Sequence, residues 1–166
     1  RAIAVLGAAD GAKVRVLEEF DPSLPDVFGN ADALVQVLIN LLANAREACA
    51  GAHAPNVVVR TRFASGLQLH SIDGATSVAL PVELRVSDNG PGVDAAMRDH
   101  IFEPFVTTKK AGQGLGLPLV RKLVREMNGR VSLDRDEERG LTHFRVHLPV
   151  AEQMRRPRTV RRRAAP

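Results

Sequence analysis

Residues 31–50, ADALVQVLINLLANAREACA, place apolar side chains at helical spacing around most of the circumference of a helix. At 100° per residue, the main apolar stripe comprises Leu34, Leu38, Leu41, Ala45 and Ala48, with Val35, Ile39 and Leu42 beside it. A helix that is apolar nearly all round is buried on most sides. We therefore expect a long core helix here, after the turn that contains Pro22 and Pro25.

One narrow polar stripe interrupts this helix. Gln36, Asn40, Asn44 and Glu47 are spaced four, four and three residues apart, so they line one edge. A solvated edge is one interpretation, although such edges are normally built from Glu and Lys, and asparagine is a poor helix former. The other is a site, in which two stacked amide oxygens hold a hydrated Mg²⁺ whose shell is completed by phosphate oxygens.

Elsewhere the hydrophobic period alternates between 2 and 3.6, which predicts a mixed α/β layer structure. The period-2 segments, which we expect to be strands, lie at residues 14–20, 57–63, 82–87, 131–133 and 142–148. The side chains of the second segment that should face the core are Val57, Val59, Thr61 and Phe63.

A second helix is expected from Leu117 to Asn128, with Gly129 as its C-terminal stop. Residues 64–80 should form an inserted loop or hairpin. Residues 89–116 are rich in glycine, threonine and proline and exceed the usual connection of about 4 to 6 residues, so we expect a functional lid with at most a short helix.

Asp88 follows Val82, Leu84 and Val86 at even spacing, so its side chain should leave the strand toward the core. A buried carboxylate needs hydrogen-bond donors. The adjoining sequence NGPG at residues 89–92 bends the backbone away and opens room for a flat polar ligand, for which an adenine amino group would serve. The alternative is an Asx turn, with Asp88 capping the next segment.

Residues 112–117, GQGLGL, open directly into the second helix, so backbone amides and the positive helix end are available to phosphate. Alone the pattern is weak, because its spacing is that of neither the lysine-ending phosphate loop nor a dinucleotide fingerprint. The alternative to a phosphate site is that these glycines only form turns. Lys109 and Lys110, just upstream, would reach an anionic ligand or remain solvated surface residues.

The formal net charge of +4 belongs to the C-terminal end of the chain. The arginines that more than account for it are Arg155, Arg156, Arg158, Arg161, Arg162 and Arg163. The slightly acidic body, with 4% aromatic residues and no Tyr or Trp, argues against direct nucleic-acid binding. We expect residues 151–166 to be a disordered tail, with contact to acidic partners as the alternative.

A chain of 166 residues fits one domain with an adequate core. Its single cysteine, Cys49, rules out an intramolecular disulfide and suits a reducing compartment, so we expect a cytoplasmic protein. The sequence has no membrane segment of about 18 apolar residues and no signal-peptide pattern. Because it begins at Arg1, we expect the chain to be part of a longer protein.

Taken in order, these segments resemble the sequence boxes of the histidine kinase branch of the GHKL ATPases, which also include gyrase, Hsp90 and MutL. NLLANAREA at residues 40–48 resembles the N box, and DNGPGV at 88–93 the first glycine box. FEPFVTTK at 102–109 resembles the F box, and GQGLGL the second glycine box. Thr142 followed by Phe144 is similar to the final Thr-x-Phe strand.

The resemblance, which spans residues 13–150, implies a Bergerat fold: an α/β two-layer sandwich with a mixed, mostly antiparallel sheet of about five strands on about three helices. ATP would lie under a mobile lid. The resemblance also implies that Asn44 coordinates Mg²⁺ with help from Asn40, and that Asp88 binds the adenine amino group with Thr142 nearby through water. Further implied nucleotide contacts are Glu47, Gly90, Gly92, Val93, Phe105, Lys109, Gly112, Gly114, Leu115, Gly116 and Leu117.

In the gyrase and Hsp90 branch a glutamate one turn before the metal-binding asparagine activates water, whereas this chain has Asn40. An amide cannot accept a proton, so we expect the nucleophile to be a neutral imidazole rather than water. None of the chain's histidines has the sequence pattern of a phosphoacceptor helix: His53, His70, His100, His143 and His147. We expect the last two on the outer face of a strand, as surface residues.

We therefore expect a protein-histidine kinase catalytic domain at residues 13–150, preceded at 1–12 by the end of a linker. It would donate the γ-phosphoryl group of Mg-ATP to a histidine on a dimerising helical domain and then to a response-regulator aspartate. DPSLP at 21–25, Glu47 and FEPFVTTK at 102–109 resemble the NtrB-type nitrogen-regulation kinases, and the full-length protein would be a homodimer.

Two alternatives remain at this stage. Many histidine kinases carry a basic residue where this chain has Glu47, which leaves open a nucleotide-sensing module without catalysis. An ATP-driven clamp of the gyrase and Hsp90 kind is disfavoured by Asn40.

Overall fold

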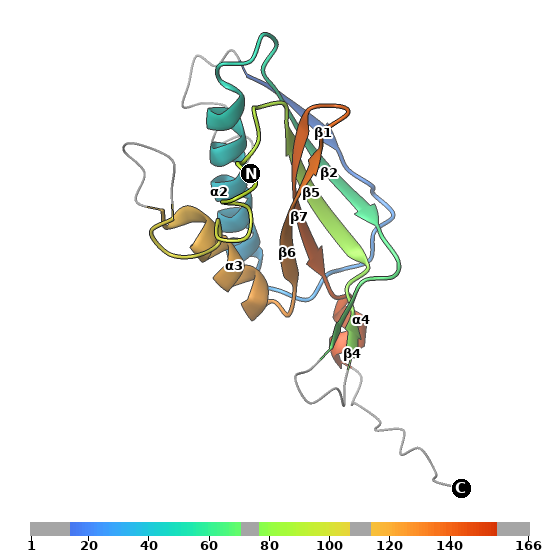
Figure 1. Cartoon of the computed structure of the whole chain (residues 1–166). Coiled ribbons are helices and arrows are strands. Elements are labelled where there is room, and N and C mark those ends of the chain that lie inside the picture. The colour runs from blue at the N-terminus through green and yellow to red at the C-terminus, as the bar shows by residue number, and fades with distance from the viewer. Residues whose placement is uncertain (1–13, 71–76, 107–113, 156–166) are drawn as a thin grey trace, which may run out of the picture.

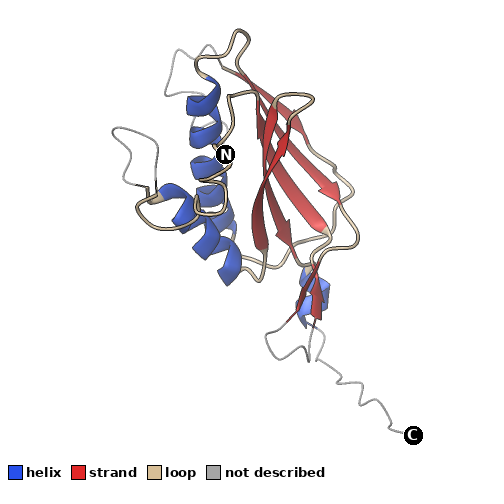
Figure 2. Ribbon diagram, viewed as in Figure 1, coloured by secondary structure: helices blue, strands red, loops and turns tan. Residues whose placement is uncertain are grey.

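The computed structural model describes residues 14–70, 77–106 and 114–155, and in it helices pack on one face of a five-stranded sheet (Figures 1 and 2). In sheet order the strands are β1 (Arg15–Glu19), β2 (Asn56–Phe63), β5 (Val82–Asp88), β7 (Leu141–Leu148) and β6 (Arg130–Asp136). The β1 and β2 strands are parallel, and the other neighbours are antiparallel. The predicted α/β sandwich with a mixed sheet is confirmed.

The insertion between β2 and β5 forms a separate two-stranded sheet of β3 (Gln68–His70) and β4 (Ser77–Ala79), so the expected hairpin is confirmed. The helices are α2 (Ala31–Cys49), α3 (Gly116–Glu126) and α4 (Ala151–Arg155). The short α4 occupies the start of the stretch expected to be a disordered tail. The Ala151 amide donates to the Asp26 carbonyl at 2.8 Å, which holds α4 against the body.

The α2 helix begins at a cap that the sequence reading did not identify. The Asn30 side-chain oxygen accepts hydrogen bonds from the amides of Asp32 and Ala33, at 2.8 and 3.1 Å, which satisfies donors left free in the first turn. The most buried side chains of α2 are Val37, Leu41, Leu42, Ala45 and Cys49. The core-facing stripe is therefore rotated away from Leu34, which is partly buried, and from Ala48, which is exposed.

Figure 1 shows α2 and α3 on one side of the sheet, and the hydrophobic core is formed by residues of these helices and of the sheet face beneath them. It contains Val57 and Val59 from β2, as predicted. Phe63 was predicted to face the core and is instead 56% exposed. It stands at the end of β2, paired with Val82, and is not part of the core cluster under the helices.

The α3 helix was predicted to run to Asn128 but ends at Glu126. Asn128, not Gly129, takes the left-handed conformation, with φ of 55°. The Gly129 amide bonds to the Val124 carbonyl at 2.9 Å. A Cβ atom at Gly129 would lie 2.6 Å from the His147 carbonyl oxygen, so glycine is needed here for the close approach of the helix end to β7 and not for its turn.

The outer face of the sheet is not covered by a helix in the described part of the chain (Figure 2), yet it contains buried polar groups. Glu83 is 1% exposed and accepts two hydrogen bonds from Arg62, at 2.7 and 3.0 Å. The expectation that His143 and His147 are surface residues is wrong. His143 is buried against the Ser87 hydroxyl at 2.7 Å, and His147 lies 3.3 Å from Glu83. Burial lowers the pKa of both histidines.

None of the helices in the described ranges is long and apolar enough to cross a membrane.

Candidate functional site

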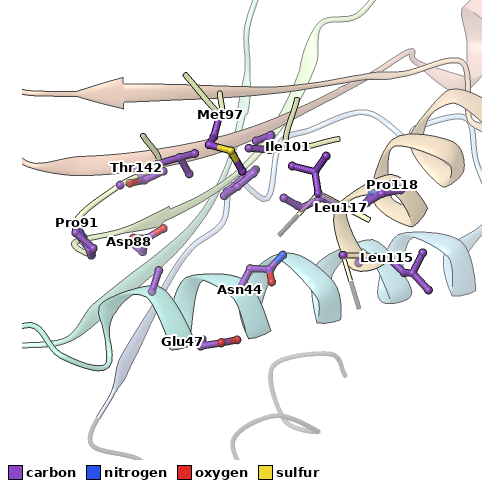
Figure 3. Close-up of a pocket in the computed structure, with 17 residues that line it drawn as sticks. Asn44, Glu47, Asp88, Pro91, Met97, Ile101, Leu115, Leu117, Pro118 and Thr142 are labelled. Atoms are coloured by element: carbon purple, nitrogen blue, oxygen red, sulfur yellow. The ribbon is translucent and has the colours of Figure 1, made fainter. Parts of the chain in front are cut away.

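A cavity of 560 Å³ opens between α2, the ends of β5 and β7, and the segments that flank the central lid (Figure 3). Its size is typical of a small-molecule site. The lining residues are Asn44, Glu47, Ala48, Asp88, Pro91, Gly92, Val93, Met97, Ile101, Val106, Gly114, Leu115, Gly116, Leu117, Pro118, Thr142 and Phe144.

The polar edge of α2 supplies one wall of this cavity. Asn44 and Glu47 line it, and in Figure 3 the Asn44 amide extends from α2 toward Leu117. Asn40 does not line the cavity. Its amide nitrogen donates to the Gln36 carbonyl at 2.9 Å, and its oxygen lies 3.2 Å from where a Cβ of Gly116 would stand. Asn40 therefore packs beneath the start of α3, behind Asn44.

Asp88 occupies one end of the cavity, as Figure 3 shows, and it is 2% exposed. Its Oδ1 accepts the Gly90 amide at 2.9 Å, which is the Asx turn that was one of the two alternatives. The carboxylate also lines the cavity, so both interpretations hold at once. Burial raises the pKa of Asp88, while the Gly90 amide and the Arg135 charge lower it, with a net rise.

The backbone after Asp88 fits tightly against the end of α2. A Cβ atom on Gly90 would lie 2.7 Å from the Ala48 carbonyl oxygen, so no larger residue fits without a shift. Gly90 itself lies behind the cavity wall, whereas Gly92, with φ of 86°, lines the cavity together with Pro91 and Val93. The first glycine segment therefore forms the wall beside Asp88.

Thr142 stands directly opposite Asp88 on the neighbouring strand β7, and it is 3% exposed. Its hydroxyl oxygen accepts a hydrogen bond from Arg135 at 2.9 Å. The same guanidinium nitrogen donates to the Gly90 carbonyl at 3.0 Å. Sequence reasoning missed Arg135, because an arginine in a short strand near the charged turn 136–139 carries no local sign of burial.

The second glycine segment forms the opposite end of the cavity. Gly114, Leu115, Gly116 and Leu117 line it at the start of α3. Leu115 at the N-cap makes no side-chain capping bond, so the amides of the first turn have no side-chain acceptor there. Free amides at a positive helix end are suited to binding phosphate.

Of the remaining predicted contacts, Phe105 is not brought into the cavity. Phe105 has φ of 67° and its side chain is 77% exposed, so the ring does not line the cavity. Its backbone instead contacts Gly114, where a Cβ would lie 2.7 Å from the Phe105 carbonyl carbon. Lys109 and Gly112 lie outside the described residues.

The lining includes apolar residues that were not among the predicted nucleotide contacts. They are Ala48, Pro91, Met97, Ile101, Val106, Pro118 and Phe144. The spacing of Met97 and Ile101, four residues apart, was the available signal in the sequence for a shared face. An apolar pocket with a few polar groups at its ends suits a flat, partly apolar ligand.

Among the described residues, no group of three or more His, Cys, Asp or Glu side chains is placed to hold a metal ion. A cation at this site would therefore depend on the Asn44 amide oxygen, the Glu47 carboxylate, water and oxygens of the ligand. That oxygen-only donor set fits Mg²⁺, which keeps several waters and binds together with phosphates.

The chain is similar to the sensory histidine kinase/phosphatase NtrB of Rhizobium leguminosarum bv. phaseoli, with 41% identity over 139 residues, 84% of this chain and 36% of that protein. Identity to NtrB of Rhodobacter capsulatus is 43% over 145 residues, 87% of this chain and 39% of that protein. The chain thus spans little more than a third of the length of these curated relatives.

Among solved structures, the catalytic domain of histidine kinase ThkA, in a nucleotide-free form, matches with a TM-score of 0.63 and 25% identity, over 82% of this chain and 79% of that one. A family model described as histidine kinase-, DNA gyrase B-, and HSP90-like ATPase matches residues 29–152. That range includes every residue that lines the cavity. The chain therefore belongs to the histidine kinase-, DNA gyrase B- and HSP90-like ATPase family.

Proposed function

We propose that this chain is the ATP-binding catalytic domain of a two-component sensor histidine kinase of the nitrogen-regulation type. The observation that carries the proposal is a single cavity lined by Asp88, by Asn44 and by the glycine-rich start of α3. The domain donates the γ-phosphoryl group of ATP to a histidine on a dimerising helical domain. An aspartate of a response regulator then receives it, and the full-length protein acts as a homodimer.

The orientation of the nucleotide follows from the two ends of the cavity. Asp88 and Thr142 form the base end, where a buried acceptor suits an adenine amino group. The amides of Gly116 and Leu117 form the phosphate end, with the positive helix end behind them. The apolar side chains of Met97 and Ile101 lie between and pack against the flat base.

Mg²⁺ at the phosphate end would be held by Asn44, with Glu47 one turn further along α2. When bound, it would neutralise phosphate charge during transfer. Glu47 supports this requirement, because a carboxylate that lines the same cavity as a triphosphate repels it unless a cation lies between them.

The nucleophile in this proposal is a histidine and not water. Asn40, at the position of the water-activating glutamate in the hydrolytic branch, has an amide that cannot accept a proton. Its nitrogen is already bonded to the Gln36 carbonyl. Of the histidines in the described part of the chain, His143 is buried on the outer face of the sheet, away from the cavity, which is consistent with an acceptor on another domain.

A second candidate function is a nucleotide-sensing module that binds ATP or ADP without transfer. Glu47 favours it, because the carboxylate lines the cavity where many histidine kinases have a basic residue. For the domain organisation, we propose that residues 1–12 end a linker, that 13–150 are the catalytic domain and that 151–166 are a tail outside the catalytic unit.

The proposal is tested in two steps. Isothermal titration of ATP and ADP with and without Mg²⁺ should show Mg²⁺-dependent ATP binding, reduced more than about ten-fold by Asn44→Ala, an effect near 1.4 kcal/mol. Gln36→Ala, on the same edge of α2 but exposed and outside the cavity, is the matched control. The helical domain is then supplied in trans with γ-labelled ATP. Label on its histidine supports the kinase, whereas nucleotide binding with no transfer under any pairing selects the sensing module.

A further inference from the structure

Arg135 is a largely buried cation beside the base end of the cavity, and no part of the proposed function uses it. It lies on β6 directly opposite Thr142 of β7. Its side chain is 11% exposed, although arginine is almost never buried unless it is paired. A charged guanidinium that is largely removed from water must be stabilised by its contacts within the protein.

Those contacts bring three elements of the base end together. One guanidinium nitrogen donates to both the Thr142 hydroxyl, at 2.9 Å, and the Gly90 carbonyl, at 3.0 Å. The guanidinium also packs against Gly92, where a Cβ would stand 3.2 Å from its central carbon. Arg135 thus fixes the wall after Asp88 relative to the strand that carries Thr142.

A second arginine holds the other end of the same wall. Arg98 donates to the Val93 carbonyl at 3.0 Å and pairs with Glu137 at 2.9 Å, and Glu137 lies 3.5 Å from Arg135. The wall from Gly90 to Val93 is therefore tied at one end to β6 and at the other, through Arg98, to Glu137, the residue that follows β6. Because the Arg98 and Glu137 side chains are exposed, the buried Arg135 makes the stronger connection.

The bond to Thr142 also decides what the threonine offers to a ligand. Its oxygen accepts from a cation, so its own hydrogen points away from that cation and is available to an acceptor in the cavity that Thr142 lines. Asp88, on the same face of the neighbouring strand, presents an acceptor. The base end therefore presents an acceptor beside a donor.

This pair distinguishes the two purines. Adenine has an amino donor next to a ring-nitrogen acceptor, whereas guanine has a carbonyl oxygen in place of the amino group. The pair complements adenine and sets an acceptor against an acceptor in guanine. A site built to hydrogen-bond one group rejects the analogue that lacks it strongly.

We propose that Arg135 is a positioning residue of the base end, which through Gly90 and Thr142 holds the acceptor and donor that select adenine over guanine nucleotides. This inference rests on the proposed function, since it concerns the same nucleotide site. It assigns to Arg135 no contact with the nucleotide itself.

Charge supports the same role. The described charged or titratable groups that act electrostatically on Asp88 are Arg135 from β6 and Cys49 from α2. Arg135 is the cation that opposes the rise in the pKa of Asp88 caused by burial. Without it, Asp88 would be protonated at higher pH and would accept an amino proton less well.

The test uses the 166-residue chain and the affinities of Mg-ADP and Mg-GDP between pH 6 and 8. Arg135→Met, which keeps the length but removes charge and donors, should raise the Kd of ADP about ten-fold and leave that of GDP nearly unchanged, a selectivity loss near 1.4 kcal/mol. ADP affinity in this variant should also fall as the pH decreases. Arg139→Met changes an arginine that is 79% exposed in the adjoining turn and should match the wild type.

The outcomes separate the two claims. A wild-type chain that binds neither nucleotide would reject the proposed function itself. Tight ADP binding with an unchanged ratio of GDP to ADP Kd in folded Arg135→Met would reject only the role of Arg135. Arg135→Gln, which keeps a neutral donor, should also lose selectivity for ADP over GDP. If Arg135→Met does not fold, an unchanged ratio of GDP to ADP Kd in Arg135→Gln would reject the role of Arg135. A wild-type selectivity that disappears between pH 8 and 6 would also overturn the inference.

Discussion

Replacing Gly90 by alanine is the sharpest test of how the cavity is built. The added methyl would lie 2.7 Å from the carbonyl oxygen and 2.8 Å from the carbonyl carbon of Ala48, and 2.9 Å from Asp88 Oδ1. An ordinary carbon–oxygen contact is about 3.4 Å, so the loop must move by about 3.4 − 2.7, or ~0.7 Å. The backbone atoms of α2 cannot rotate away, and Asp88 moves with the loop.

Two costs follow from this displacement. Overpacking against a fixed backbone costs about 1–3 kcal/mol of unfolding free energy. The hydrogen bond from the Gly90 amide to the Asp88 carboxylate is weakened, and a bond to a charged group contributes about 1.5–3 kcal/mol. We expect an unfolding free energy lower by about 2–4 kcal/mol and, because Asp88 is displaced from the base, an ADP affinity lower by about 100-fold.

The assays are urea unfolding, and titration calorimetry of Mg-ADP at a temperature where the variant is folded. Gly51→Ala, just after α2, is a matched control, because its Cβ would meet nothing within 4 Å. It should lower neither the unfolding free energy nor the affinity for ADP. A folded Gly90→Ala that binds ADP within about three-fold of the wild type would refute the claim that this contact positions Asp88.

Three further changes test other parts of the fold. Burial raises the pKa of Glu83, but Arg62, His147 and Arg145 together lower it further, so the folded-state pKa lies below its ordinary value. The ionised Glu83 therefore stabilises the fold fully above the ordinary glutamate pKa of about 4.3. That stabilisation is lost as the pH falls through the lowered pKa. Glu83→Gln should cost about 2 kcal/mol in urea unfolding at pH 7, against less than about 0.5 for the exposed Glu126→Gln. Asn128→Gly should be tolerated, whereas Gly129→Ala should destabilise by about 1–3 kcal/mol; the reverse order in thermal melts would contradict the assigned helix end. Burial raises the pKa of the Cys49 thiol, so a thiol reagent at pH 8 should label it only after unfolding, and rapid native labelling, seen by mass spectrometry, would show that α2 opens at its end.

Much of the fold follows from periodicities within single segments. The long helix, the five strands and the inserted hairpin each reflect a hydrophobic pattern a few residues long, which does not depend on what lies across the core. Asp88 belongs to the same class, because even spacing after three apolar residues directs its side chain inward. Its burial, and its place beside Asn44 in one cavity, match the expectation.

Other features had no local sign. The outer strand positions of His143 and His147 looked solvent-facing, but on the neighbouring strand β5 the Ser87 hydroxyl bonds to the buried His143, and Glu83 pairs with the largely covered His147. Part of the cavity's apolar lining, including Met97 and Ile101, was also missed, since the lining comes from several separate segments.

By itself the sequence determined the elements, the family boxes and the inward acid, because these are properties of residues near one another along the chain. Only the tertiary structure decided that Arg135 supports the base end. Its bond to Gly90 joins residues 45 apart in sequence, and it exists because the register of β6 on β7 places Arg135 opposite Thr142. Strand register is set by the packing of the whole sheet, and no short segment contains it.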